Sequence, residues 1–456
     1  MRLIARFAKE LKDGFEIITV YDKKTIKELI PKNNTRLKSI AHTNICAAWF
    51  ERKISDDFGI EIYDSFDTRK LVHQETFPKN IHPMLKVFDK DQTIEPAQFE
   101  LYPYERIKGD SIFEVSVGPI HAGIIEPGHF HFSQAGEDIL HLEVRHFYKY
   151  RAIEKMVEGL TLQEAKPIIE RISGNETIAY QIALRDIILA STQISLPKSM
   201  QKQHAFLLEL ERVIHHITDI GFIPNDAGFA PALAYASKLA EESRRMMKSI
   251  TNHRFGFGAV KLESLCFDFE KIDIFLDQLE KDILWFENWS NDIPSLADRL
   301  DTTGILPRHK AIKFDTTGVV ARASNVSIDR RDNDFYKQHG FQLIKEDSGD
   351  VAARFKVRIK EILNSIAMMR NFLDNEKFKI DMHNFQDGEY LSYVESSIGE
   401  LFMYADIKDG KIDRFFVRDP SFINWQALHV MMHGNIIADF PLINKSCDLS
   451  YAGNDL

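Results

Sequence analysis

A loop rich in glycine, proline and titratable side chains occupies residues 118–132, GPIHAGIIEPGHFHF. It carries His121, Glu126, His129 and His131 between two segments that alternate like β-strands. A partly buried imidazole and carboxylate can both titrate near neutral pH, so His121 and Glu126 are candidate proton carriers. When spacing alone is considered, a tight hairpin turn with surface histidines is the favoured interpretation, and both remain open at this point.

The other histidines and the cysteines give weaker signals. His129 and His131 would share one face of a strand, but two histidines without a third ligand are weak evidence for a metal site. Neighbouring helical residues such as His215 and His216 diverge by about 100 degrees, so at most one can face a given site. The three cysteines are isolated thiols without a CxxC pair: Cys46, Cys266 and Cys447. We therefore expect neither a disulfide framework nor a self-contained zinc or iron–sulfur site, and a reducing compartment.

The elements that position these residues indicate an α+β protein. Residues 1–88 mix strand-like and helix-like stretches, such as 15–21 and 39–54, which is typical of a small α+β domain. Residues 89–110 contain prolines, many charges and no periodicity, and predict a linker. Residues 111–456 predict a large, mainly helical domain that opens with a β-hairpin layer.

Apolar residues at three- and four-residue spacing predict a series of helices in the large domain, at residues 160–172, 176–190, 200–221, 231–250 and 349–375. Thr161 and Glu164 resemble a capping box before the first of them. Two later strand segments follow, with a turn at Lys408-Asp409-Gly410. The large domain should therefore carry strands near both ends of its sequence.

The composition excludes several classes of protein. A formal charge of −10 and 28% charged residues argue against a nucleic-acid binder, which needs a clustered excess of Lys and Arg. No run reaches the roughly 18 apolar residues of a membrane span, and the first residues do not resemble a signal peptide. We expect contact with a membrane only through partner subunits.

Several motifs in order resemble a known family. The chain is similar to the large subunits of energy-converting nickel–iron hydrogenases of the formate hydrogenlyase type, and more distantly to the quinone-site (49 kDa) subunit of respiratory complex I. The resemblance rests on GPIHAGIIEPGHFHF (118–132), ERISGNETIAY (170–180), LELERVIHHITDIGFIPNDAGF (208–229), ARASNVSIDRRD (321–332), VESSIGEL (394–401) and the segment 418–446. Separately, WFERKISDDFGIEIYDSFDTRKLV (49–72) resembles the ER-x-x-x-D-x-FGI signature of the smaller (30 kDa) complex I subunit, which is fused ahead of the large one in these hydrogenases.

The resemblance implies a hydrogenase-large-subunit-like domain from which the metal ligands are missing. The family holds its nickel–iron pair with soft thiolates from an early and a late cysteine pair. This chain aligns Ser173 and Glu176 with the early pair and Ser450 and Gly453 with the late pair. Ile398 stands where the family has an arginine beside the iron ligands, and Cys447 falls three residues before the late motif position. We therefore expect no metal in this chain and a vacated pocket at these positions.

By the same resemblance, His121 and Glu126 would line that pocket. Asp226 matches an aspartate that partners a loop histidine in complex I, and Glu126 matches a glutamate that passes protons in the hydrogenases. Further charged residues occupy family motif positions, and we expect them to form buried ion pairs that tie helices together: Arg151, Glu154, Arg212, Arg322, Asp329, Arg330 and Arg354.

The sequence thus predicts a subunit of a membrane-bound, complex I-like oxidoreductase that couples electron transfer to proton or ion translocation. The resemblance implies partners that include an iron–sulfur small subunit, a ferredoxin-like subunit and integral membrane antiporter-like subunits, at the cytoplasmic face of the inner membrane. No cofactor would be bound by this chain, apart from a possible quinone. Two alternatives stay open: a quinone-reducing core subunit, and a redox-silent docking subunit.

Overall fold

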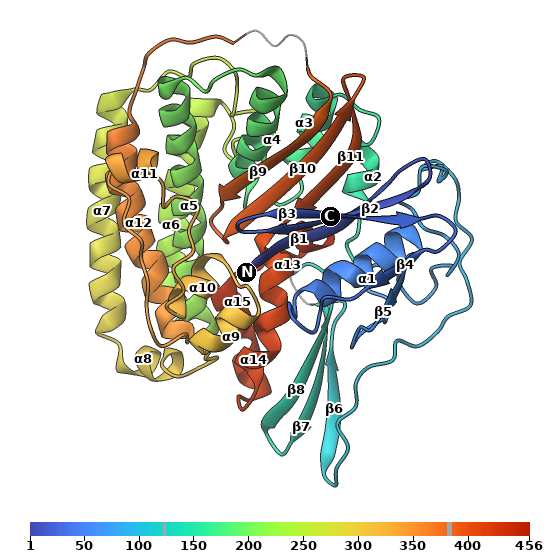
Figure 1. The fold of residues 1–456 in the computed structure, drawn as a ribbon. Helices are drawn as coiled ribbons and strands as arrows, with labels where there is room; N and C mark the ends of the chain where they lie inside the picture. The colour runs from blue at the N-terminus through green and yellow to red at the C-terminus, as the bar shows by residue number, and fades with distance from the viewer. Residues whose placement is uncertain (122–124, 381–384) are drawn as a thin grey trace.

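The computed structural model describes residues 1–121, 125–380 and 385–456, and Figure 1 shows the arrangement of its helices and strands. The chain opens with an antiparallel sheet of three strands in the order β1-β2-β3: Leu3–Glu10, Gly14–Tyr21 and Thr25–Pro31. Helix α1 (Ala47–Phe58) packs against β1. Beside it, β4 (Arg36–Lys38) pairs in parallel with β5 (Glu61–Tyr63). This part of the chain is a small α+β unit, as predicted.

Strand β1 is buried along nearly its whole length. One reason is that α1 packs against it, and another is that the C-terminal sheet reaches it. The ring of Phe7 stacks on Phe416 with centroids 4.3 Å apart, and Arg418 Nε donates to the carbonyl oxygen of Ile4 at 3.0 Å. The hydrophobic core therefore continues from the N-terminal sheet into the large part of the chain.

Residues 64–111 form neither helix nor strand, which agrees with the irregular segment predicted there. They run along the molecule between α1 and the next sheet (Figure 1). Tyr102 is buried under the guanidinium of Arg145, 4.1 Å from the ring centroid. The segment is thus fixed to the large domain through its aromatic residues.

A second antiparallel sheet, in the order β6-β7-β8, extends from the lower edge of the molecule in Figure 1: Ile112–Val117, His129–Ala135 and Asp138–Arg145. Gly136, with φ of 62°, makes the tight turn between the last two strands. The β-hairpin layer predicted at the start of the large domain is confirmed.

Long helices form the body of the large domain (Figure 1). The central helix α5 (Lys198–Asp226) packs against α6 (Ala230–Thr251) and α12 (Val351–Phe372), and α7 (Phe269–Asn291) covers the outer side. The remaining helices are α2 (Ile153–Val157), α3 (Leu162–Ile169), α4 (Thr177–Thr192), α8 (Pro294–Leu300), α9 (Arg308–Lys313), α10 (Gly318–Ala323), α11 (Asp334–Gln338), α13 (Pro420–Asn424), α14 (Leu428–Met432), α15 (Phe440–Cys447) and α16 (Tyr451–Asp455), with the 3-10 turns Trp425–Ala427 and Ile437–Asp439. The predicted capping box is confirmed: Thr161 Oγ1 accepts from the Glu164 amide, and the Glu164 carboxylate accepts from the Thr161 amide.

The third sheet, in the order β11-β10-β9, lies between the helical body and the N-terminal sheet: Gly388–Glu395, Glu400–Lys408 and Lys411–Arg418 for β9, β10 and β11. Asp409 and Gly410 adopt positive φ values of 51° and 72° at the predicted turn. Strand β10 is buried except at its last residue, because it is the middle strand of a covered sheet. Within the described residues, no helix is both long enough and apolar enough to cross a bilayer.

Candidate functional site

The four positions that resemblance assigns to metal ligands come together in the interior. Ser173 precedes α4, Glu176 is the residue before its first turn, and Ser450 caps α16. The hydroxyl oxygens of Ser173 and Ser450 lie 3.0 Å apart, and the Gly453 amide donates to Ser450 Oγ at 2.9 Å. Ser173 and Glu176 are fully buried. The early and late motifs therefore meet as the resemblance implies, but through hydroxyls.

Arg151 connects the same two segments through their main chains. Its Nη2 donates to the carbonyl oxygen of Ile172 at 2.7 Å and to that of Ala452 at 2.9 Å. Both carbonyls belong to residues next to or near the serines of the site. We predicted an ion pair for Arg151, and that prediction is wrong: the guanidinium satisfies carbonyl groups of irregular segments instead.

Asp419, which no motif in the sequence indicated, closes the site. Its Oδ2 accepts from the Tyr180 hydroxyl at 2.8 Å, and its Oδ1 accepts from the Ser421 amide at 2.8 Å. A Cβ atom built on Gly453 would lie 2.1 Å from Asp419 Oδ2. The carboxylate thus fills the space in which a side chain at position 453 would begin.

Glu176 faces Asp419 from the other motif. The Ser396 hydroxyl donates to Glu176 Oε1, and the glutamate side chain is fully buried. Burial raises the pKa of Glu176 well above its usual value, and the charge of Asp419 raises it further. Burial likewise raises the pKa of Tyr180. Glu176 is therefore a neutral carboxylic acid at pH 7, able to give up or exchange a proton.

These donor atoms do not fit a nickel–iron pair. The site offers hydroxyls and carboxyls, which are hard ligands, where the metals require soft thiolates. Cys447 is buried and its Sγ lies 3.7 Å from Met431 Sδ, so the thiol is packed into the apolar core. Across the part of the chain that the structure describes, no group of three or more His, Cys, Asp or Glu residues is arranged to hold a metal ion.

The loop before β7 reaches the site through Glu126. Glu126 Oε2 accepts from the Ala452 amide at 2.9 Å, and Oε1 pairs with the ammonium of Lys149. The two side chains are about one-third exposed, at 32% for Glu126 and 37% for Lys149. Glu126 therefore lies at the rim of the late motif, between solvent and the first turn of α16.

His121 and Asp226 do not form the pair that the resemblance implies. His121 Nε2 lies 2.7 Å from the carbonyl oxygen of Gly128 and closes the loop on itself. Asp226 ends α5, where Asn225 donates to its Oδ1 at 3.3 Å, and burial raises its pKa. Of the three predicted catalytic residues, Glu126 is the one that contacts the late motif.

The other histidines have local structural partners. On β7, the Tyr104 hydroxyl lies 2.8 Å from His129 Nδ1, and burial lowers the pKa of His129 to about 4. His131 Nδ1 lies 3.1 Å from the Ser116 hydroxyl. His216 Nε2 lies 2.9 Å from Glu361 Oε2. These contacts favour structural roles over metal binding.

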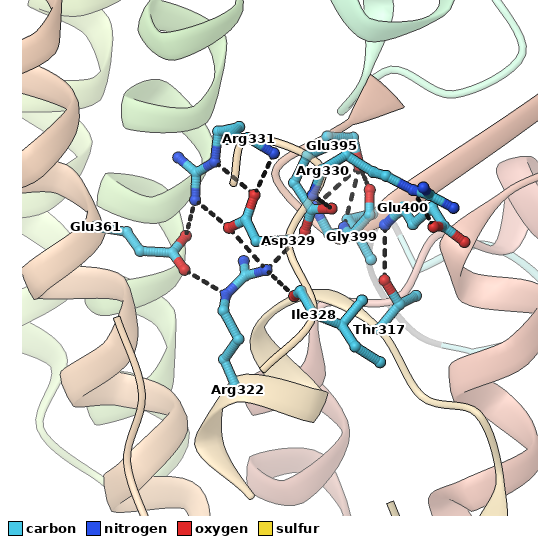
Figure 2. Close-up of polar contacts among 12 residues, drawn as sticks. Thr317, Arg322, Ile328, Asp329, Arg330, Arg331, Glu361, Glu395, Gly399 and Glu400 are labelled. Atoms are coloured by element: carbon cyan, nitrogen blue, oxygen red, sulfur yellow. Dashed lines mark hydrogen bonds and ion pairs between the residues drawn. The ribbon is translucent and has the colours of Figure 1, made fainter. Parts of the chain in front are cut away.

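The predicted buried ion pairs form a network around Arg322, drawn in Figure 2. Arg322 donates from Nε to Glu361 at 2.7 Å and from Nη1 to Glu395 at 2.6 Å. Ion pairs are confirmed for Glu154, Arg212, Arg322, Asp329 and Arg330. The prediction is wrong for Arg354, which donates to the Ser446 hydroxyl and to the carbonyl oxygens of Gly304 and Gly349, because those loop carbonyls have no helical partner.

Comparison with known proteins identifies the family. The family model for the 49 Kd subunit of respiratory-chain NADH dehydrogenase matches residues 226–386 and 375–455, just over half of the chain. The chain belongs to this family. A second model, for the 30 Kd subunit of the same enzyme, matches residues 7–93, so this member of the 49 Kd family carries both subunits in one polypeptide.

Relatives of this 49 Kd family member include hydrogenase components. The chain is 27% identical to hydrogenase-4 component G of Escherichia coli over 452 residues, covering 94% of this chain and 78% of the relative. It is also 27% identical to formate hydrogenlyase subunit 5 of Escherichia coli, with 94% and 79% covered. An NADH-quinone oxidoreductase subunit of Phocaeicola vulgatus is 25% identical, with 88% and 83% covered.

A solved structure shares the fold. It is an archaeal membrane-bound sulfane sulfur reductase, a respiratory membrane complex. The TM-score is 0.69 at 20% identity, covering 78% of this chain and all of the matched chain. This likeness supports the fold of the 49 Kd family and says nothing by itself about the substrate.

Proposed function

We propose that this chain is a peripheral-arm subunit of a membrane-bound, hydrogenase-related oxidoreductase complex that couples electron transfer to proton or ion translocation without a nickel–iron site of its own. Membership of the 49 Kd family and the two hydrogenase relatives support the complex. The absence of a metal centre is supported by one observation: Ser173 bonds to Ser450 where thiolates would face each other. Asp419 fills the adjoining space at Gly453.

We infer that electrons arrive through an iron–sulfur cluster on a partner small subunit. A ferredoxin-like subunit and antiporter-like membrane subunits would complete the complex at the cytoplasmic face of the inner membrane. The fused 30 Kd-like and 49 Kd-like segments and the hydrogenase-large-subunit-like helical domain support this assembly. Contact with the membrane would then be made by partners.

The size of the interior site favours coupling over binding of an electron acceptor. The cavity beside Asp419 and Gly453 measures about 10 Å³. A cavity of roughly 10–15 Å³ holds about one water molecule. A quinone headgroup does not fit there unless the site opens, whereas a proton carried by Glu176 needs no such space. The interior therefore favours proton movement, with quinone reduction as the second candidate because of the NADH-quinone oxidoreductase relatives.

Elemental analysis of the intact complex tests the proposal. The complex is purified from membranes through an affinity tag on this chain, and nickel, iron and acid-labile sulfide are measured per copy of the tagged chain. We expect iron and sulfide from partner clusters and no stoichiometric nickel. Stoichiometric nickel, or hydrogen uptake that is lost in a Ser173→Ala variant of an assembled complex, would overturn the proposal. Inhibition of electron transfer by quinone analogues would favour the second candidate.

A further inference from the structure

Glu395 is a buried carboxyl in the strand end next to the site. It ends β9 and is 1% exposed. Its Oε1 accepts from Arg322 Nη1 at 2.6 Å, and its Oε2 accepts from the Arg330 amide at 3.1 Å (Figure 2). Both oxygens thus receive donors, from α10 and from the loop that follows it.

The buried cluster around Glu395 holds one more acid than bases. Its carboxyls are Glu209, Asp329, Glu361 and Glu395, and its guanidiniums are Arg212, Arg322 and Arg331. His216 beside Glu361 does not restore the balance, because burial lowers its pKa to about 4 and leaves it neutral. An uncompensated buried charge is costly, so such a cluster tends to take up a proton.

Glu395 is the member best placed to hold that proton. Burial raises its pKa to about 7, and the charge of Asp329 adds to this, while Arg322 and Arg331 oppose it. The pKa values of Asp329 and Glu361 are held below the usual range by their arginine partners. On the side of α4, Arg185 and Asp186 pair with each other at 2.6 Å.

A pocket connects Glu395 with solvent. It measures about 130 Å³ and is lined by Glu395 together with Asp186, Arg330, Tyr336 and Tyr393. Since a water molecule occupies roughly 30 Å³ of liquid, the pocket has room for several. A proton can therefore pass between bulk water and this buried carboxyl without opening the fold.

The turn that follows Glu395 contacts the interior site. Ser396 donates its hydroxyl to Glu176 Oε1. Arg212 holds the turn by donating to the carbonyl oxygens of Glu395 and Ser396 at 2.7 and 2.6 Å. The same turn thus presents Glu395 to the charged cluster and Ser396 to Glu176.

We propose that Glu395 takes up and releases a proton, through water in the pocket at Arg330 and Tyr393, when the charge at the interior site near Glu176 changes. A water molecule of the pocket donates the proton to the carboxylate and receives it back, so no electron or further reactant is consumed. This inference rests on the proposed function, because that function supplies the change of charge. It adds the residue and the route by which solvent protons reach the interior.

The protonation of Glu395 is tested first on the full-length chain. Infrared spectra recorded across pH 5 to 9 should contain a buried carboxylic C=O band that disappears around neutral pH. The Glu395→Gln variant should lack the band, and Glu395→Asp should retain one at a shifted pH. Glu389→Gln, in the same strand but paired with Lys9 and Lys27 near the surface, is the control and should keep the wild-type band. A band that survives unchanged in Glu395→Gln would overturn the proposal.

The role of Glu395 in coupling is tested on the intact complex in vesicles. Electron transfer in Glu395→Gln should stay within a factor of two of wild type, while protons translocated per electron should fall severalfold; Glu395→Asp should restore part of the ratio. An unchanged ratio in Glu395→Gln would overturn the assignment to Glu395 alone. A wild-type complex that translocates no ion would overturn the proposed function and this inference with it. If Glu395→Gln does not assemble, Glu395→Asp decides: an infrared band at the wild-type pH contradicts the proposal.

Discussion

The hydroxyl oxygens of Ser173 and Ser450 lie 3.0 Å apart, although 277 residues separate them in the sequence. Two hydroxyls at this distance satisfy each other by a hydrogen bond, whereas two thiolates would repel and need a cation between them. The amide of Gly453 adds a second donor to Ser450. The junction between the start and the end of the large domain, which resemblance assigns to metals, is therefore held here by hydrogen bonds.

Gly453→Ala should destabilise the protein through a steric clash. The new Cβ would lie 2.1 Å from Asp419 Oδ2, and forcing extra atoms into a packed interior costs about 1–3 kcal/mol. The free energy of unfolding in urea, followed by tryptophan fluorescence, measures this. Gly174→Ala is the control: its Cβ meets nothing within 4 Å, so its cost should stay within about 0.5 kcal/mol.

A double-mutant cycle with Asp419→Ala identifies the cause of that loss. Asp419→Ala removes the carboxylate and leaves the Tyr180 hydroxyl without its acceptor, so it is destabilising by itself. In that background, Gly453→Ala should cost less than in the wild type, because the clashing group is gone. Equal costs in both backgrounds would show that the carboxylate is not what Gly453 accommodates.

Glu176→Gln should change how stability depends on pH. Because the pKa of Glu176 is raised in the folded state above its usual value of 4.5, the folded chain keeps a proton that the unfolded chain releases. Its stabilising contribution is complete below about pH 4.5 and declines as pH rises, by up to about 1.4 kcal/mol per pH unit. Gln mimics the neutral acid and cannot titrate, so the variant should lose less stability than wild type between about pH 5 and 8.

Urea unfolding of both proteins at several pH values gives the comparison. The surface variant Glu263→Gln is the control and should run parallel to wild type, since its side chain is 57% exposed. Parallel curves for Glu176→Gln and wild type would mean that Glu176 is ionised in the folded state. The difference between the two proteins, and not the slope of either alone, is the test, because other buried carboxyls such as Glu211 also titrate with raised pKa values.

Local pattern and ordered motifs predicted most of the elements that carry the site. The hairpin layer, the turn at Asp409 and the meeting of Ser173 with Ser450 follow from residue types and their order. Strand β1 was not predicted, because it is buried on both faces and shows no alternation. Helix α7 was also missed, although its buried residues recur at the three- and four-residue spacing of a helix.

Contacts between distant segments could not be predicted. Asp419 lies in a segment that carries the family resemblance, but its importance comes from its distance to Gly453, which only folding sets. Lys149 was missed for the same reason, since its pairing with Glu126 depends on where the loop folds back. An Asp followed by Pro at the start of α13 was the one local signal for Asp419, and it indicates only a helix cap.

Arg322→Met should be strongly destabilising. Arg322 pairs with Glu361, Glu395 and Asp329 within 3.1 Å, and all of them are buried. Removing the cation leaves these carboxylates uncompensated, which costs about 3–5 kcal/mol for a buried pair. Arg245→Ala, whose side chain is 76% exposed beside Glu241, is the matched surface control and should cost about 0–1 kcal/mol.

Arg322→Lys separates charge from geometry in the same assay. A lysine keeps the positive charge, but its compact ammonium cannot replace the planar fork that reaches Glu361 from Nε and Glu395 from Nη1. We expect a loss between those of Arg322→Met and wild type. A Met variant as stable as wild type would show that these carboxyls share protons when the guanidinium is removed.

Glu126→Gln should uncouple proton translocation while leaving the chain folded. The amide oxygen can still accept from the Ala452 amide, so the link to the late motif is kept. The ion pair with Lys149 is lost, but both side chains are about one-third exposed, so the cost in stability should be no more than about 1 kcal/mol. In the assembled complex we expect electron transfer near the wild-type rate and a severalfold lower number of protons translocated per electron, because an amide cannot carry a proton at neutral pH.

Lys149→Gln is the matched control for that experiment, since it breaks the same ion pair and leaves the Glu126 carboxyl in place. If loss of the pair itself were responsible, both variants would lower the proton yield equally. If the carboxyl carries the proton, Lys149→Gln should keep most of the yield while Glu126→Gln does not. A Glu126→Gln complex with the full proton yield would place the proton route elsewhere, because this substitution leaves the Ala452 hydrogen bond intact and removes the titrating group.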